Sequence, residues 1–147
     1  MPNMSLGREV IEEVAAFTRK LKASFASLVR ERNMTLPRAR VFFALSKKDG
    51  INQRELAELL DLETPTLVRI LDAMEAQNFV ERRTPDADRR AKQIFMTEAG
   101  RAIASEVDEL ATEVRARVIE GISEQELRVA LKVVRAMMAN LTSVGKD

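Results

Sequence analysis

The chain has 147 residues, of which 46% are hydrophobic, and this is enough for one domain with its own core. It contains no cysteine and no histidine, which excludes disulfides, thiolate chemistry and the side chain that most often serves as general base or metal ligand. We therefore expect no catalytic residues, no metal and no cofactor, and, because no signal peptide or membrane-spanning stretch is recognisable, a soluble cytoplasmic protein.

The charged residues are unevenly distributed, although the formal net charge is only +1. Residues 19–40 hold seven basic side chains against one acidic, and residues 82–92 hold five against two. Residues 105–126, in contrast, hold seven acidic side chains against two basic ones. The first two segments should attract phosphate groups, and the third should repel them.

Apolar residues at three-, four- and seven-residue steps predict a first amphipathic helix over residues 6–30. Pro37 suits the first turn of a second helix, which should end at Asp49 and Gly50. The positions expected on the inner faces of these two helices are Val10, Val14, Phe17, Leu21, Leu28, Val41, Phe42 and Leu45.

Two shorter helices should follow, each opened by residues that are typical of a helix N-terminus. Asn52 and Glu55 have the spacing of a capping box, so a third helix should start there and end near Leu62. Thr64 as N-cap, with Pro65 at the first helical position, should open a fourth helix. The inner faces of the two helices are predicted to carry Leu56, Leu59, Leu60, Leu67, Ile70, Leu71 and Met74.

Beyond residue 78 the hydrophobic period changes from that of a helix to that of a strand. Residues 79–83 and 92–97 predict the two strands of a hairpin, and the intervening TPDADRRA has turn chemistry and a basic tip.

Two further helices complete the chain. Thr97 can cap a long fifth helix that runs to Gly121, and Ser123 with Glu126 has the spacing of a capping box that opens a sixth. We therefore predict a mainly α fold with a small β-hairpin. The sixth helix should present one apolar side made of Leu127, Ala130, Leu131, Val134, Met138 and Leu141.

Two short helices joined by a tight turn and followed by a hairpin with an arginine-rich tip are typical of a winged helix-turn-helix. Such a fold places one helix in the major groove of double-stranded DNA and a basic ribbon, the wing, against the minor groove or backbone. On the fourth helix, Pro65, Thr66, Arg69 and Ala73 lie opposite the apolar face. Arg69 suits a guanine or a phosphate, and the hydroxyls of Thr64 and Thr66 suit a phosphate oxygen or base edge.

Several of these basic residues also have simpler interpretations. Arg69 can pair with Asp72 or Glu75 on its own helix. Arg82 and Arg83 can protect a strand edge from aggregation instead of binding phosphate. Both alternatives stay open at the level of sequence.

The tip of the hairpin carries two arginines beside Asp88, which is more charge than solubility requires. A carboxylate in that position can hold a guanidinium group in a fixed orientation. The residues that we expect to contact DNA are Thr64, Pro65, Thr66, Arg69, Arg83, Asp88, Arg89, Arg90, Lys92 and Arg38.

The segment 36–100 resembles the MarR family of bacterial regulators, and particularly its SlyA branch. The family's wing pattern is Asp-x-Arg, five residues and then Leu-Thr, and it is met by Asp88, Arg90 and Met96-Thr97, with methionine in place of leucine. The family's recognition helix, of the type PSLVRTLDxLE, is similar to PTLVRILDAME in this chain. The flanking helices match the family in length and order.

The resemblance implies a triangular homodimer whose two winged lobes straddle one inverted-repeat operator, and hence a place on the nucleoid. It implies a single MarR-type domain over 1–147, with a DNA-binding lobe at 33–97 and dimerisation helices at 5–32 and 98–143. The long apolar stripes of the first and sixth predicted helices independently favour a partner surface.

Many members of the family release DNA when a small aromatic acid binds between the dimer body and the winged lobe. An arginine beside aromatic rings could hold such an anionic effector, although phenylalanines at helical spacing are more often part of a core. The candidates for this site are Arg19, Phe17, Arg38, Phe42 and Phe43.

Two other functions compete with a ligand-released repressor. A winged helix can serve as a protein-interaction module, but such a wing should bury apolar side chains rather than carry Asp88, Arg89 and Arg90 at its tip. An enzyme with paired carboxylates would need two acids in an apolar cleft, and the acidic residues instead follow solvated helix faces. We therefore expect a non-enzymatic regulator, and the sequence does not distinguish repression from activation.

Overall fold

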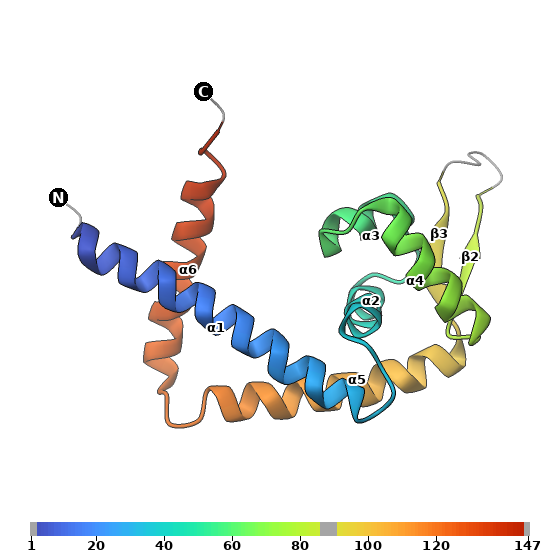
Figure 1. The fold of residues 1–147 in the computed structure, drawn as a ribbon, viewed down its shortest axis with the longest axis horizontal. Coiled ribbons are helices and arrows are strands. Elements are labelled where there is room, and N and C mark those ends of the chain that lie inside the picture. Colours follow the sequence, from blue (N-terminus) through green and yellow to red (C-terminus); the bar gives the residue numbers. More distant parts are fainter. Residues whose placement is uncertain (1–2, 86–90, 146–147) are drawn as a thin grey trace. The chain divides into compact units, whose positions relative to one another are not determined.

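The computed structural model describes residues 3–85 and 91–145 and divides the chain into two compact units, Met1–Glu113 and Val114–Asp147. Helices dominate both units, as the sequence predicts (Figure 1). The elements in chain order are α1 (Met4–Arg30), α2 (Leu36–Lys47), β1 (Ile51–Asn52), α3 (Gln53–Leu60), α4 (Thr64–Ala76), β2 (Val80–Arg83), β3 (Gln93–Met96), α5 (Glu98–Val118) and α6 (Glu124–Leu141).

Two of the predicted helix caps can be compared directly with the structure. Ser123 and Glu126 form the complete capping box at the start of α6. Asn52 caps α3 through its side chain, but Glu55 does not complete that box, because its carboxylate pairs with the Lys48 ammonium group at 3.1 Å. A long side chain at the third helical position can reach either partner, and spacing alone does not decide between them.

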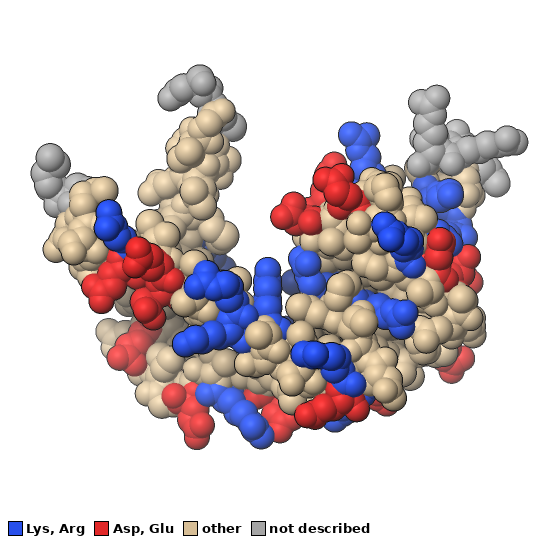
Figure 2. All heavy atoms as spheres, viewed as in Figure 1, with Lys and Arg blue, Asp and Glu red and all other residues tan. Residues whose placement is uncertain are grey.

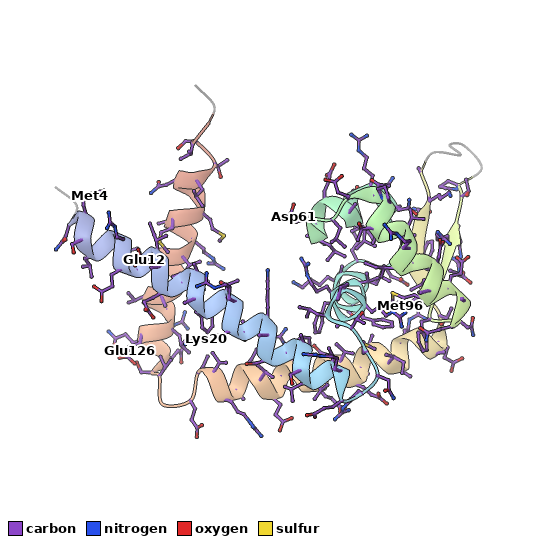
Figure 3. All side chains as sticks on the ribbon, viewed as in Figure 1. Met4, Glu12, Lys20, Asp61, Met96 and Glu126 are labelled. Atoms are coloured by element: carbon purple, nitrogen blue, oxygen red, sulfur yellow. The ribbon has the colours of Figure 1, made fainter. Side chains whose placement is uncertain are left out.

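Helix α3 differs from the prediction at its end and on one face. It ends at Leu60, and the next residue, Asp61, is labelled at this end of the helix in Figure 3. Asp61 takes the left-handed conformation with a φ of 52°. Leu59 is 61% exposed, so its predicted burial is wrong. The buried face of this short helix is made of Leu56, Ala57 and Leu60, and Leu59 lies outside it.

The sheet has three strands in the order β1-β3-β2, where the sequence predicts only the β2–β3 hairpin. The additional strand β1 pairs antiparallel with β3, with Ile51 opposite Ile94. Gly50 precedes β1 with a φ of +77°, and a Cβ atom there would lie 2.7 Å from the Phe95 ring. Glycine therefore allows the chain to turn beneath that ring and enter the sheet.

The core of the winged part lies between α2, α3, α4 and the sheet. Phe42 is buried in it and meets Phe79 edge-on, with ring centroids 6.0 Å apart. Its largest fully buried side chains are Phe42, Leu45, Leu56, Leu67, Leu71, Met74, Ile94, Val41 and Val80. Their close packing holds α4 at a fixed angle to the sheet.

The start of α5 is pressed against the link between α4 and β2. The Thr97 hydroxyl donates to the Asn78 carbonyl at 2.6 Å and, as predicted, caps the helix by accepting from the Gly100 amide at 3.0 Å. A Cβ atom on Gly100 would lie only 2.0 Å from the Phe79 carbonyl oxygen. Only glycine permits this approach, which joins α5 to the winged part. Helix α5 then ends at Val118, three residues before the predicted Gly121.

Helix α1 buries only Phe25 and Val29, and α6 buries none of its residues. The apolar stripes predicted on both helices are therefore largely exposed in a single chain. Within residues 3–85 and 91–145, no helix is both long enough and apolar enough to cross a membrane. The exposed large apolar side chains of α1 and α6 are Met4, Leu6, Val10, Ile11, Val14, Phe17, Val129, Leu131, Val133, Val134, Met138 and Leu141.

Candidate nucleic-acid interface

Helix α4 buries one face and exposes the other, as the predicted recognition helix requires. Leu67, Leu71 and Met74 are buried against the core. Thr66 and Arg69 are exposed, and the sequence predicts both as DNA contacts. Lys and Arg side chains lie over α4 and the neighbouring strands, with acidic side chains beside them (Figure 2).

The start of α4 differs from the prediction by one residue. Glu63 is the N-cap, without a side-chain capping bond, and Thr64 is already the first helical residue. The predicted capping role of Thr64 is therefore wrong. Proline is tolerated throughout the first helical turn, because the amides of that turn have no intrahelical partner. The position of Pro65 therefore predicts the first residue of α4 only to within one turn. Thr64, Pro65 and Thr66 are all exposed at this end.

Arg82 binds both carboxylates that the sequence offers as partners for Arg69. Its Nη2 atom lies 2.5 Å from Asp72 Oδ1, and its Nε atom lies 3.2 Å from Glu75 Oε2. The backbone amide of Arg82 also donates to Glu75 Oε2, at 3.1 Å. The Arg82 side chain is only 18% exposed.

Glu75 and Arg82 influence each other's pKa. The side-chain hydrogen bond from Arg82 lowers the pKa of Glu75, against an opposing effect of burial. The hydrogen bond to Glu75 likewise raises the pKa of Arg82. Both shifts favour the charged forms, so Glu75 and Arg82 form an ion pair at neutral pH.

Arg83 lies on the opposite face of β2 and makes different contacts. Its guanidinium carbon lies 4.2 Å from the centre of the Phe95 ring, and the same group pairs with Glu81. Glu81 is directly opposite Phe95 in the β2–β3 register. Arg83 remains mostly exposed, so these contacts orient its charge at the wing without removing it from solvent.

The other predicted wing contacts are only partly described. Asp88, Arg89 and Arg90 lie outside the described residues. Lys92 is exposed just before β3, and its carbonyl accepts a hydrogen bond from the Gln53 amide at 2.8 Å. The second root of the wing is thereby joined to the start of α3.

Arg38 has a contact that the sequence does not indicate. It lies in the first turn of α2, and its Nη1 atom donates a hydrogen bond to Gln77 Oε1 at 3.1 Å. Gln77 is the C-cap of α4, so Arg38 places a positive charge near the carbonyl end of that helix.

The residues predicted for an effector are distributed over separate environments. Phe42 is part of the core, whereas Phe43 packs on Phe25 of α1 with ring centroids 5.6 Å apart. Phe17 and Arg19 are exposed on α1. In the part of the chain that the structure describes, Phe42 is therefore buried and does not form a surface site with Arg38 or Arg19.

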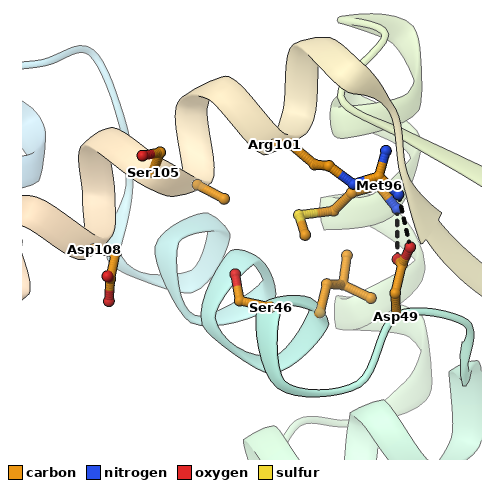
Figure 4. Close-up of a pocket in the computed structure, with 8 residues that line it drawn as sticks. Ser46, Asp49, Met96, Arg101, Ser105 and Asp108 are labelled. Atoms are coloured by element: carbon orange, nitrogen blue, oxygen red, sulfur yellow. Dashed lines mark hydrogen bonds and ion pairs between the residues drawn. The ribbon is translucent and has the colours of Figure 1, made fainter.

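A different pocket lies between α2 and α5, with a volume of about 550 Å³ (Figure 4). Arg101 points to Asp49 across its edge, and the two groups pair at 3.1 Å. Asp49 also accepts from the Met96 amide at 2.9 Å, so it joins the ends of α2 and β3. The lining is Leu45, Ser46, Asp49, Met96, Arg101, Ala104, Ser105 and Asp108.

Comparisons with known proteins agree with this geometry. A sequence model described as MarR family matches residues 32–91. The chain is similar to the solved transcriptional regulator PA3341, at 32% identity and a TM-score of 0.81, over 89% of this chain and 96% of that one. It is also similar to a MarR-family transcriptional regulator from Silicibacter pomeroyi, at 25% identity and a TM-score of 0.77, over 91% and 90% of the two chains.

A third structure has the same fold and was solved with DNA. It is described as a MarR-family transcriptional regulator from Listeria monocytogenes complexed with 26mer DNA, and it shares 17% identity with a TM-score of 0.79 over 89% of this chain and 87% of that one. The winged fold, the matching sequence segment and the similarity along almost the whole chain lead to one assignment: the protein belongs to the MarR family of transcriptional regulators.

Proposed function

We propose that this protein is a sequence-specific, double-stranded-DNA-binding regulator that acts as a homodimer on an inverted-repeat operator. The observation that carries the proposal is the exposed face of α4. It presents Thr66 and Arg69 from a helix whose opposite face is fixed in the core. A rigid helix of this kind can place side chains against base edges in the major groove.

The composition of that face favours close approach to DNA. Pro65, Thr66 and Ala73 are small or compact, so the helix can lie deep in the groove beside Arg69. The guanidinium group can donate two hydrogen bonds to a guanine, and the threonine hydroxyls can bond to a base edge or a phosphate.

The wing supplies the second contact in the proposal. Arg83 and Lys92 are exposed at its two roots, and the sequence between them adds Arg89 and Arg90. The minor groove encodes little sequence, so the wing should contribute affinity and sensitivity to groove width. MarR-family regulators bind DNA, and the similar structure from Listeria monocytogenes, described as complexed with 26mer DNA, supports this arrangement.

The homodimer is proposed from the exposed apolar side chains of α1 and α6. Leu131, Val134 and Met138 form part of one exposed stripe on α6, which a second copy of the chain would cover. A two-fold pair of recognition helices then requires two half-sites in inverted orientation, about one helical turn or roughly 10 base pairs apart.

Selection from a random duplex library tests this function. The purified protein should retain duplexes that share an inverted repeat, and footprinting should show protection of both half-sites. Binding should weaken steeply with salt, because basic residues release counterions from the backbone. Retention of duplexes without a common motif, or a preference for single-stranded DNA or RNA, would refute the proposal.

Release by a small anionic aromatic effector is the second part of the proposal. It is supported only by the exposed Arg19, which shares α1 with Phe17, and by the partly exposed Arg38 of α2. Benzoate can serve as the probe: it should raise the thermal midpoint of the free protein and lower operator affinity. An unchanged midpoint and affinity at millimolar benzoate would count against a repressor controlled by this class of ligand.

A further inference from the structure

The cluster of Arg82, Asp72 and Glu75 joins the wing to the recognition helix at one point. Arg82 lies in β2, opposite Ile94 of β3, and the two carboxylates lie one turn apart on α4. By strand alternation Arg82 points to the same side as the buried Val80, which is the side of α4. Four hydrogen bonds of the structure, one of them from the backbone, connect Arg82 to these two acids.

These contacts occupy the Nε–Nη2 edge of the Arg82 guanidinium group, which is one of the edges with which it could bind a phosphate. Nε and Nη2 both donate to carboxylates, and the side chain is mostly buried beneath the strand. Releasing it for a phosphate would leave Asp72 and Glu75 without their cation on the border of the DNA-binding face. Arg83, on the other side of β2, is the mostly exposed arginine at this root of the wing.

The charge balance of α4 depends on the same contact. The helix itself carries one basic residue, Arg69, and two acidic residues, Asp72 and Glu75. Without Arg82 its net charge would be −1, which opposes approach to DNA. The helix together with Arg82 is neutral.

We propose that Arg82 is a positioning residue for DNA binding: through Asp72 and Glu75 it holds the wing at a fixed orientation to α4, so that both can contact one operator half-site together. The inference rests on the proposed DNA-binding function. A wing that is already oriented loses less conformational freedom on binding, and the affinity is correspondingly higher. The predicted direct contacts remain Arg69 and the exposed wing residues.

Glu75→Gln gives the sharpest test, because charge counting and the positioning role predict opposite changes in operator affinity. The substitution removes a negative charge from the border of the DNA-binding face, so charge counting predicts tighter binding. The positioning role predicts that the operator is bound about tenfold more weakly. This is the size of effect expected when two residues of one ion-pair network are uncoupled. The matched control is Glu58→Gln, which removes the same charge from the exposed Arg54–Glu58 pair of α3 and should not weaken binding.

Three further variants separate positioning from simple stability and from direct phosphate contact. Arg82→Met should weaken operator binding, and Arg82→Lys should recover part of the loss. The double variant Arg82→Met with Glu75→Gln should bind no more weakly than Arg82→Met alone, because both substitutions break the same contact between β2 and α4. Affinities are measured at a temperature at which circular dichroism shows every variant folded. A purely stabilising role would then leave them unchanged.

The outcomes distinguish this inference from the proposed function. If the wild type binds its selected operator and Glu75→Gln binds as tightly or more tightly, the positioning role is wrong while the DNA-binding function stands. Additive losses for Arg82→Met and Glu75→Gln would also overturn it. If the wild type binds no duplex, the proposed function itself fails, and the positioning role fails with it.

Discussion

Arg69 is the exposed side chain of α4 whose chemistry is most specific for a base. Because the major groove distinguishes all four base pairs, Arg69→Ala should cost about 1–3 kcal/mol of binding free energy and blur the preference at particular positions. Affinities for the selected operator and for a set of single-base variants measure both effects. A uniform loss over all sequences would instead identify Arg69 as a phosphate contact.

Gly100 provides a prediction about stability. An added Cβ atom would meet the Phe79 carbonyl oxygen at 2.0 Å, so Gly100→Ala must displace backbone where α5 meets the winged part. We expect about 1–3 kcal/mol lower unfolding free energy from urea denaturation. The control is Gly7→Ala in α1, which meets nothing within 4 Å and should be neutral or stabilising. Equal effects of the two substitutions would contradict the close approach.

At the scale of single residues, the sequence predicts exposure well and partners poorly. Helical periodicity correctly places Thr66 and Arg69 opposite the buried face of α4. It does not predict that Arg82 binds Asp72 and Glu75, because those contacts cross from a strand to a helix seven and ten residues earlier. Such contacts depend on how the elements pack.

Among the elements, α6 offers a pH-dependent prediction through its capping box. The Ser123 amide and hydroxyl donate to Glu126 Oε2 at 2.9 Å and 3.0 Å, and these bonds lower the pKa of Glu126. A carboxyl whose pKa is lowered by folding stabilises the folded state above its unfolded pKa and loses this effect as pH falls through the folded value.

The stability difference between wild type and Glu126→Gln should therefore be constant near neutral pH. It should shrink on the acidic side of the ordinary glutamate pKa. Urea denaturation followed by circular dichroism from pH 7 to pH 3 measures it. A difference that stays constant over the whole range would show that the carboxylate does not stabilise the start of α6.

The sequence predicts the long elements better than the short ones for a physical reason. Helices α1, α2, α5 and α6 carry several turns of periodic apolar residues, and each lies where the sequence predicts it, with ends that differ by up to about three residues. Strand β1 has two residues, too few to show a period, and only its pairing with β3 reveals it. The sequence predicts the start of α4 one residue too late, because proline is permitted anywhere in the first turn.

At the scale of the whole molecule, the proposed dimer should dissociate when a charged residue is introduced into the exposed apolar stripe of α6. Leu131→Asp should raise the dimer dissociation constant about tenfold or more, because an unpaired carboxylate would enter an apolar interface. Gln125→Asp is the control, since it introduces the same charge on the opposite side of α6. Sedimentation at micromolar concentration measures both variants, and equal dimerisation would contradict an interface on this stripe.

The most direct test of the central claim is the stoichiometry and half-site dependence of the DNA complex. Sedimentation equilibrium of the wild type on its selected, fluorescently labelled duplex should give two chains per duplex. Scrambling either half-site should weaken binding to nearly the same extent, because one recognition helix of the dimer would then read no sequence. One chain per duplex at full affinity, or a scrambled half-site without effect, would contradict a homodimer that reads an inverted repeat.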